Sequence, residues 1–270
     1  DQYVSTNSNR LSVGMDEIPD YLGKAFVAIE DERFYQHNGI DFKSIIRAGY
    51  QFFKTGGEEA QGASTITQQL LKNTVFTDWT SEGNNKIKKI KRKIQEQYLA
   101  LEITKYYSKD EILLRYMNAI NLGQNTLGVE SASLRYFGKH CSELTISECA
   151  VIASITQNPS KYNPIRHPEE NVKRREKCLN KMLELGFISQ TQYDEAMADT
   201  DAVYERIGLY DIDYQEANAT TGSYFSDAVY EQVKQDLILS GYNENMAETL
   251  LTSGGLRVES TLDPKIQAIL

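Results

Sequence analysis

Cysteine is scarce in this sequence of 270 residues, and a long apolar run is absent from it. The three cysteines, Cys141, Cys149 and Cys178, match neither a CxxC pair nor the spacing of zinc ligands. Their odd number leaves at least one unpaired, so we expect no disulfide framework. No run of about 18 apolar residues is present, which predicts no membrane-spanning helix. The start at Asp1 suggests a processed or excised chain, from which an upstream anchor is missing.

Histidine is scarce as well, with three in the chain. His37 and Asp41 lie close together in the sequence, as two metal ligands often do. With so few histidines we instead expect a single buried or turn-forming His37. The sequence also contains no internal repeat and no low-complexity tract.

The composition is that of an ordinary globular protein, with 40% hydrophobic and 25% charged residues. The net charge of -9 is unevenly spread: from Met182 onward there are 16 acidic and 4 basic residues, which leaves 22 acidic and 25 basic residues before it. Such an asymmetry suggests two segments with different partners, although an acidic, solvated surface explains the second segment equally well.

Helical periodicity dominates the chain as far as Leu185, and few alternating strand patterns compete with it. Gly, Pro and Asn separate the periodic segments. The predicted fold class is therefore mainly α. We expect helices at residues 22–30, 42–53, 64–73, 87–101, 109–118, 127–136, 145–155 and 169–185.

The sequence changes character after Leu185. Residues 207–219 are acidic and rich in Tyr, residues 224–240 are helical in pattern, and residues 256–261 alternate like a strand. We place a domain boundary near residue 200, giving a first domain of residues 1–200 and a short α/β segment of residues 201–270.

The stretch Ala28–Asp41 passes from an apolar helix into adjacent acids and then a glycine turn. Five apolar or small residues precede Glu30, so we expect its carboxylate to be partly desolvated. Desolvation makes a carboxylate a better proton acceptor at neutral pH, which favours a general base. A solvated helix cap is the alternative.

A second stretch, Gln61–Asn73, places a glycine and small hydroxyl residues at the start of a helix. Free backbone N–H groups and the positive end of the helix dipole attract anions there. Lys72 follows Gln68 by four residues, so both share a helical face with Ser64 and Thr65. That face suits a diphosphate, and an ordinary capped helix is the alternative.

A third stretch contains six cations in the eight residues 86–93, followed by Glu96. At 100° per residue, Glu96 points away from the stripe of Ile87, Ile90 and Ile94 and toward the basic side of the helix. A carboxylate among cations stays ionised and can pair with them, bind a divalent metal or stabilise charge in a transition state. A solvated basic face, or a surface for anionic lipid headgroups, is the alternative.

Taken in order, these stretches resemble the peptidoglycan glycosyltransferases of family 51, the glycosyltransferase domains of class A, bifunctional penicillin-binding proteins. The family pattern EDxxFxxHxGxD matches residues 30–41, GxSTxTQQLxKN matches 62–73, and RKxxE matches 92–96. KxxIxxxYxNxxxxG matches residues 109–123, and RRxxxLxxM matches 174–182. The end of the chain, Gly254–Asp263, resembles the segment that leads into the transpeptidase of these proteins.

Departures from the family pattern are small and leave both acids in place. Ala63 stands where many members have a second Gly, Asn121 where Tyr is common, and Cys178 where Val is usual. The segment 76–85 is longer than in some relatives. These departures bear on substrate contacts rather than on the reaction.

The resemblance implies a lysozyme-like, two-lobed helical domain with a cleft beside a mobile apolar jaw near the membrane. Phe42, Ile45, Ile46, Tyr50, Phe52 and Phe53 suit that jaw, and a core stripe is the alternative.

The resemblance further implies that lipid II is polymerised into glycan strands by inverting transfer, with release of undecaprenyl pyrophosphate. Glu30 is then the general base and Glu96 the second catalytic acid, which orients the cations or recruits Mg²⁺ or Mn²⁺. No organic cofactor is expected. The substrate-binding residues implied are Asp31, Phe34, His37, Arg47, Ser64, Thr65, Gln68, Gln69, Lys72, Asn73, Lys88, Arg92, Lys93 and Asn118.

The partners implied are lipid II, the growing glycan strand, the bacterial membrane surface, moenomycin-type inhibitors and other cell-wall synthesis proteins, but no nucleic acid. The expected location is the outer face of the bacterial cell membrane, held by an N-terminal transmembrane helix missing from this chain.

Two alternatives stay open. One is a lysozyme-like enzyme or lytic transglycosylase that cleaves glycan with two carboxylates, and the other is an inactive membrane-surface scaffold. A KTG sequence at residues 54–56 matches one element of a penicillin-reactive serine site, but no SxxK nucleophile motif accompanies it.

Overall fold

The structure is a computed structural model that describes residues 9–55, 62–76, 86–124, 126–208, 210, 224–253 and 258. Helices account for most of these residues, which confirms the predicted mainly α fold class. The chain divides into two compact units, one of which comprises Ser8–Ile212 and the other of which contains the last two helices. The division falls near the boundary predicted at residue 200, and the assignment of residues 201–270 to a linker stays a prediction.

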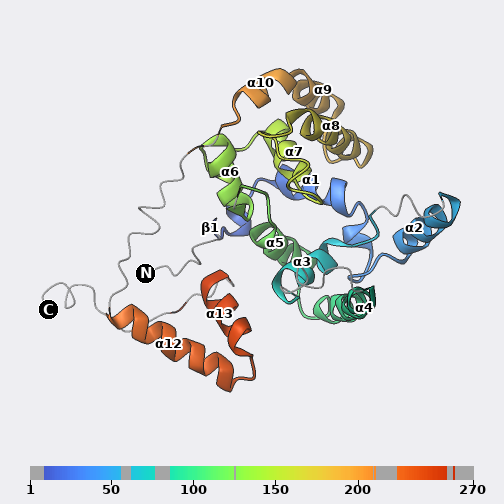
Figure 1. Ribbon diagram of the computed structural model, residues 1–270. Helices are drawn as coiled ribbons and strands as arrows, with labels where there is room; N and C mark the ends of the chain where they lie inside the picture. Colours follow the sequence, from blue (N-terminus) through green and yellow to red (C-terminus); the bar gives the residue numbers. More distant parts are fainter. Residues whose placement is uncertain are drawn as a thin grey trace, which may run out of the picture. The chain divides into compact units, whose positions relative to one another are not determined.

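The first unit contains two short strands and a series of helices (Figure 1). Its strands, β1 (Asn9–Arg10) and β2 (Thr126–Leu127), pair in parallel. Its helices are α1 (Asp20–Glu30), α2 (Phe42–Lys54), α3 (Ile66–Thr74), α4 (Lys86–Ile103), α5 (Lys109–Ala119), α6 (Val129–Phe137), α7 (Ile146–Ser154), α8 (Pro168–Glu184), α9 (Gln190–Ala198) and α10 (Thr200–Glu205).

Every helix predicted from the periodicity is present, with its ends displaced by a residue or two. Helices α9 and α10 were not predicted from the sequence, because they have few apolar positions, and only Ala196 of α9 and Val203 of α10 are buried. The strand predicted at residues 256–261 lies outside the described residues, apart from Val258.

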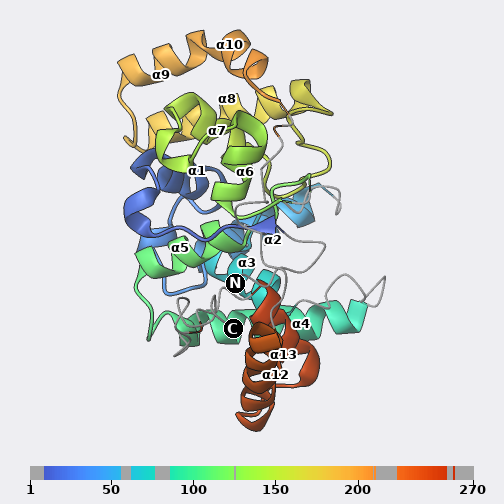
Figure 2. The ribbon, with the colours of Figure 1, turned by 90° about the vertical axis from the view of Figure 1, so that its left-hand side faces the viewer.

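Helix α1 is the central element of the first unit. It packs against α7 and α8 on one side, and α5 with α3 lies on the other (Figure 2). Its residues Leu22 and Phe26 are fully buried, and the aromatic edge of Phe26 meets Tyr116 of α5 at 5.7 Å between ring centroids. This packing fixes the direction of α1, and therefore the place where its last residue, Glu30, leaves the core.

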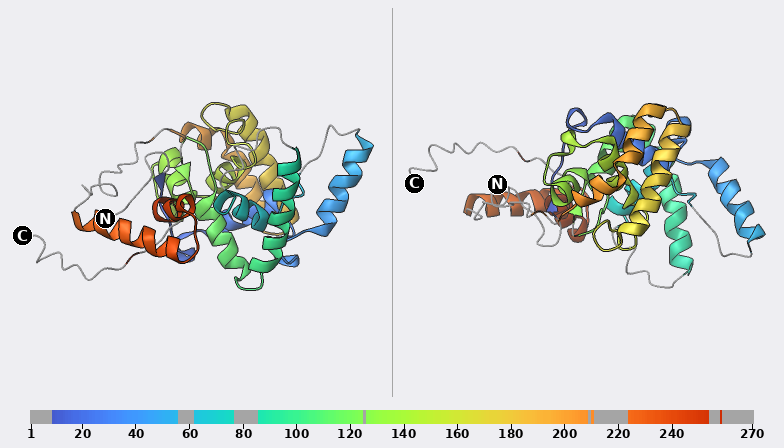
Figure 3. Two further views of the ribbon diagram at one scale, coloured as in Figure 1. Left: turned by 60° about the horizontal axis from the view of Figure 1, so that its bottom comes forward. Right: turned by 90° about the horizontal axis from the view of Figure 1, so that it is seen from above.

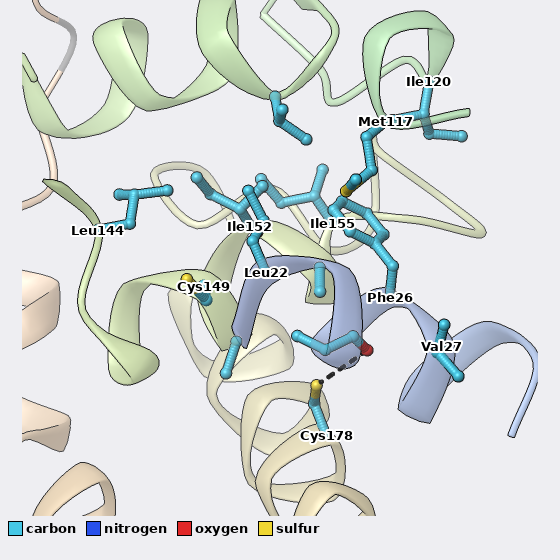
Figure 4. Packing of buried hydrophobic residues seen from close by; sticks show 14 of the residues in the cluster. Leu22, Phe26, Val27, Met117, Ile120, Leu144, Cys149, Ile152, Ile155 and Cys178 are labelled. Atoms are coloured by element: carbon cyan, nitrogen blue, oxygen red, sulfur yellow. Dashed lines mark hydrogen bonds between the residues drawn. The ribbon is translucent and has the colours of Figure 1, made fainter. Parts of the chain in front are cut away.

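All three cysteines are buried free thiols, so no disulfide framework holds the described fold, as predicted. Figure 4 shows Cys149 and Cys178 in the core. The Cys178 thiol donates a hydrogen bond to the backbone oxygen of Ala25, with 3.6 Å between Sγ and the oxygen, and this bond links α8 to α1. Burial raises the pKa of Cys178 to about 12, so the thiol stays neutral and packs as a small apolar side chain.

Helix α2 projects from the edge of the first unit (Figures 1 and 3). Phe42, Ile46 and Tyr50 expose most of their surface, which excludes a core stripe at these three positions, while Ile45 packs on a small cluster around Ile40. The side chains of Phe52 and Phe53 lie outside the described residues. An exposed apolar face on a projecting helix agrees with the predicted jaw.

The long helix α4 differs from the expectation for an amphipathic helix. Its apolar stripe of Ile87, Ile90 and Ile94 is 61–79% exposed, whereas Glu96 is buried. The side of α4 that carries Glu96 packs on α3, because Ala100 contacts Leu71 there. Arg92, Lys93 and Glu96 therefore lie on the side that faces the protein. The apolar stripe faces outward, and Lys88, Lys89 and Lys91 are exposed as well.

The second unit contains α12 (Tyr224–Leu239) and α13 (Glu244–Ser253), which pack on each other. Lys234 and Glu244 form an ion pair between the two helices at 3.0 Å. Within the described residues, no helix has the length and apolar content that a membrane span requires.

Candidate active site

A groove of about 820 Å³ opens along the end of α1 and is bordered by α2, α3, α4 and α8. It brings together predicted site residues from four separate stretches of sequence. Those that line it are Glu30, Asp31, Arg47, Ser64, Thr65, Gln68, Gln69, Lys72, Asn73, Lys93 and Glu96.

Glu30 is the last residue of α1, because Asp31 leaves the helical conformation with φ -157° and ψ 71°. The Glu30 side chain is 8% exposed, so the predicted partial desolvation is confirmed. Its Oε1 accepts hydrogen bonds from the Thr156 hydroxyl at 2.5 Å and from Nη2 of Arg174 at 2.8 Å. Its Oε2 accepts one from Nε2 of Gln69 at 2.8 Å.

Arg174 is the cation beside Glu30, and it comes from α8. Its guanidinium stacks over the Tyr162 ring at 4.8 Å and donates to the Gln157 side chain at 2.9 Å. The side chain is 10% exposed, so the ion pair with Glu30 is largely shielded from water. Arg174 therefore fixes the position of the Glu30 carboxylate at the edge of the groove.

The start of α3 is held by side chains from its own first turn. The Thr65 hydroxyl caps the helix by accepting a hydrogen bond from the Gln68 backbone N–H at 3.2 Å. In turn, the Thr65 backbone N–H donates to the side-chain oxygen of Gln68 at 3.0 Å. The Thr65 hydroxyl donates to the backbone oxygen of Gly39 at 2.6 Å. Thr65 and Gln68 thus build the groove wall and leave Ser64 at its surface.

Gly39 is required by its position. Its φ is +88°, and a Cβ at this site would lie 2.1 Å from the backbone oxygen of Ala100 in α4. Only glycine therefore allows this turn to approach both α3 and α4. The glycine of the HxGxD pattern is thereby explained by packing.

Asp31 and His37 form a buried pair behind Glu30. Nε2 of His37 lies 3.0 Å from Oδ1 of Asp31, and the Ile66 backbone N–H donates to Oδ2 at 3.0 Å. The Asp31 carboxylate therefore accepts a hydrogen bond from the first turn of α3 and links this turn to the end of α1. This arrangement agrees with the expectation of a single buried His37.

Glu96 is held among cations, as predicted. Its Oε1 pairs with Arg92, its Oε2 accepts from Nζ of Lys93 at 2.9 Å, and the carboxylate is 1% exposed. The same ammonium of Lys93 donates to the Ser64 hydroxyl at 2.9 Å. Glu96 thus orients Lys93 at the start of α3, where a positive helix end and an ammonium face the groove.

A resident divalent metal does not fit the residues around Glu96. Both of its oxygens are paired with cations, whereas Mg²⁺ prefers several oxygen ligands in an octahedral arrangement. Over the described ranges, no group of three or more His, Cys, Asp or Glu residues is gathered as a metal site would require. The expectation of Mg²⁺ or Mn²⁺ stays a prediction, and no chemical step is derived through it.

Arg47 lies on α2 and contacts the groove from the side of the exposed helix. It donates to Glu32 at 3.3 Å and to the Ser44 hydroxyl at 3.2 Å, and Glu32 also pairs with Lys181 of α8 at 3.4 Å. Burial raises the pKa of Glu32, but the hydrogen bonds and charges of Arg47 and Lys181 outweigh it and lower the pKa overall. Glu32 is therefore an ionised link between α2 and α8.

Five of the predicted binding residues lie outside the lining of the groove: Phe34, His37, Lys88, Arg92 and Asn118. Phe34 is buried beneath the ammonium of Lys109, and His37 is paired with Asp31. The Asn118 amide exchanges hydrogen bonds with the Val13 backbone at 2.9 and 3.1 Å, and Lys88 is exposed on α4. Their assignment to substrate binding stays a prediction.

Several residues at or beneath the groove were not predicted from the sequence. Thr156, which is buried and bonded to Glu30, had no recognisable signal, because a single Thr after an apolar helix is common. Arg174 had one, since it is the first Arg of the RRxxxLxxM pattern, but the pattern does not say which Arg faces the groove. The cations of α8 that line the groove are Lys173, Arg174, Lys177 and Lys181.

Comparisons with known proteins give a family match for most of the first unit. Residues 1–183 match the family model described as Transglycosylase. The chain is 40% identical to penicillin-binding protein 1A of Clostridium perfringens over 273 aligned residues, which cover 98% of the chain and 38% of that protein. It is 38% identical to penicillin-binding protein 1F of Bacillus subtilis over 259 residues, covering 96% of the chain and 33% of that protein.

The crystal structure of penicillin-binding protein 1A from Haemophilus influenzae aligns with a TM-score of 0.45 at 22% identity. The alignment covers 90% of the chain and 23% of that structure. The chain thus spans about a third of the length of the curated relatives it matches.

Proposed function

The chain belongs to the Transglycosylase family, the glycosyltransferase domains of class A penicillin-binding proteins, and from this premise we propose that it polymerises lipid II into peptidoglycan strands. The observation that carries the proposal is the groove in which the Glu30 carboxylate lies beside the Ser64, Lys93 and Glu96 cluster. A general base and an anion-holding wall in one groove are what transfer from a diphosphate donor requires.

In the proposed reaction, Glu30 takes the proton of the 4-hydroxyl of the acceptor GlcNAc. The hydroxyl oxygen attacks the anomeric carbon of the donor MurNAc and inverts it, while the bond from that carbon to the diphosphate oxygen breaks. Undecaprenyl pyrophosphate leaves with the bonding electrons. The charge that develops on the leaving group is the larger electrostatic problem, since a diphosphate without nearby cations is a poor leaving group.

Residues of α3 and α4 suit that task. Lys93 is oriented by Glu96 and bonded to Ser64, at the positive end of the α3 dipole. Lys72 and Arg47 line the same groove and add positive charge. We assign these residues to the donor diphosphate and Glu96 to the orientation of Lys93 and Arg92.

The other residues fit supporting roles in this scheme. Arg174 and Thr156 hold the Glu30 carboxylate in place before the hydroxyl arrives. The membrane surface is the natural location of a lipid-linked substrate, and the exposed apolar residues of α2 and α4 support a position at the outer face of the bacterial membrane. Moenomycin-type inhibitors would compete for the donor end of the groove.

The test is to incubate the protein with lipid II and, separately, with finished glycan strands, and to measure which is consumed. We expect lipid II to disappear and long glycan to form, with no loss of finished glycan. Cleavage of finished glycan in place of polymerisation would indicate a lysozyme-like enzyme or lytic transglycosylase. Loss of neither substrate would indicate an inactive scaffold.

A further inference from the structure

The two oxygens of the Glu30 carboxylate have different surroundings. The single hydroxyl proton of Thr156 is directed to Oε1, the closer and charged acceptor, rather than to the backbone oxygen of Ala153 at 2.8 Å. With the bond from Arg174, this uses the two lone pairs that Oε1 offers in the carboxylate plane. Among the described residues, Oε2 accepts from Gln69 alone and keeps one lone pair for another donor. A hydroxyl that enters the groove therefore finds its acceptor at Oε2.

The amide NH₂ group of Gln69 donates to Oε2 of Glu30, and the amide oxygen of Gln69 accepts a hydrogen bond from another residue. The Tyr116 hydroxyl donates to Oε1 of Gln69 at 3.2 Å. The reverse orientation of the amide would set its oxygen against the carboxylate, so the two bonds are compatible with one orientation of Gln69 only. Tyr116 and Glu30 thus hold the amide from its two ends.

Tyr116 is a rigid anchor for this amide. Its side chain is fully buried on α5, and its ring meets Phe26, which lies one helical turn before Glu30 on α1. Burial, reinforced by the nearby charge of Glu30, raises the pKa of Tyr116 well above its usual value, so the phenol remains a neutral donor at any assay pH. The hydrogen bonds from Tyr116 to Gln69 and from Gln69 to Glu30 therefore link the three helices α5, α3 and α1.

We propose that Gln69 and Tyr116 are a positioning pair that presents Oε2 of Glu30 as the oxygen that takes the proton, an inference that rests on the proposed glycosyl transfer. Neither residue exchanges a proton in the step: the proton passes from the sugar hydroxyl to Oε2. Gln69 thereby serves the base, in addition to any contact with substrate. Tyr116 acts through Gln69, without reaching the groove lining.

The experiment is a double-mutant cycle with Tyr116→Phe and Gln69→Ala, assayed by polymerisation of lipid II with the intact protein. Tyr116→Phe keeps the ring packed on Phe26 and removes only the hydroxyl. We expect kcat to fall about five- to tenfold with KM unchanged, as the loss of one hydrogen bond implies. In the Gln69→Ala background, the same change is expected to lower kcat by less than about twofold, because the amide it fixes is gone.

A matched control is Tyr136→Phe. Tyr136 is also fully buried, and its hydroxyl donates to the backbone oxygen of Leu122 at 2.7 Å, away from Glu30. Its loss is expected to lower stability by a similar amount while kcat stays within about twofold of the wild type. A comparable fall of kcat in both Phe variants would assign the effect to packing and overturn the proposal.

The coupling in the cycle supplies a second readout. Losses of kcat from Tyr116→Phe and Gln69→Ala that simply add in the double variant would contradict the positioning pair. A wild type that polymerises nothing would instead contradict the proposed function itself.

Discussion

Arg174 and Arg175 are neighbours in the sequence, yet they have opposite surroundings. Arg174 reaches the groove and pairs with Glu30, whereas Arg175 turns inward and is fully buried. Arg175 donates to Ser147 of α7 at 2.8 Å, to Thr200 of α10 at 2.9 Å and to the backbone oxygen of Ala196 in α9. The 100° turn between successive helical residues is enough to separate a groove residue from a structural one.

Replacing each arginine by lysine should separate the two roles. Lysine is a point charge that cannot reproduce the several bonds of a buried guanidinium, so Arg175→Lys is expected to lower the free energy of unfolding by about 2–3 kcal/mol. Arg174→Lys keeps a cation beside Glu30 at the groove, so it is expected to cost less stability than Arg175→Lys and to lower the polymerisation rate. Urea unfolding and the lipid II assay measure the two effects, and equal stability losses in both variants would contradict this division.

Helix α2 is attached to the unit mainly through its first turn. Asp41 caps it by accepting from the Ser44 backbone N–H at 3.1 Å, and Oδ2 of Asp41 pairs with Arg33 at 2.7 Å. Burial raises the pKa of Asp41, but the hydrogen bonds from Arg33 and Ser44 outweigh it and lower the pKa to about 2. The ionised carboxylate thus stabilises the fold at neutral pH.

The pH dependence follows from the sign of that shift. Because the pKa of Asp41 is lower in the folded chain than in the unfolded one, its contribution is complete above about pH 4 and is lost as the pH falls toward 2. Asp41→Asn keeps a good cap but loses the charge, and is expected to cost about 1–2 kcal/mol at pH 7. The difference between wild type and variant in the free energy of unfolding should shrink between pH 4 and pH 2, and a constant difference would refute the assignment.

The orientation of helix α4 on the protein could not be predicted from the sequence alone. The position of the helix and the pairing of Glu96 with cations were predictable, because both follow from local spacing. The burial of Glu96 and the exposure of Ile90 and Ile94 were not, because they depend on which side of α4 packs on α3. Periodicity gives the two faces of a helix, but the tertiary contacts decide which one is inside.

For the molecule as a whole, the fold class and most of the helices could be predicted from the sequence. The set of residues that meet in the groove could be predicted only in part. Thr156 and Arg174 lie 126 and 144 residues after Glu30 in the chain, and both contact its carboxylate. Motifs indicated the acids and the start of α3, because these residues are close in sequence. The partners from distant segments required the packing of α1 against α7 and α8.

The outer surface of the first unit combines exposed apolar and basic side chains. Ile90, Ile94 and Tyr98 of α4 are each at least 61% exposed, and lysines flank them along the same helix. An apolar stripe with cationic borders is typical of helices that lie in the headgroup region of a membrane with anionic lipids. This surface suits a protein whose substrate is anchored in lipid.

Ile90→Ser combined with Ile94→Ser is expected to weaken binding to vesicles that contain anionic lipid by about tenfold, because two apolar contacts with the acyl region are lost. Both positions are exposed, so the melting temperature should change little. Leu239→Ser, at an exposed apolar residue of α12, is the control and should bind like the wild type. Vesicle sedimentation measures binding, and an undiminished affinity of the double variant would exclude this face.

The most direct test of the account is the rate of lipid II polymerisation by Glu30→Gln. The amide keeps the size of the side chain but cannot take a proton from the acceptor hydroxyl, so the rate is expected to fall at least about a hundredfold while the melting curve stays close to that of the wild type. Chain growth within a few fold of the wild-type rate would contradict the role of Glu30 as the base.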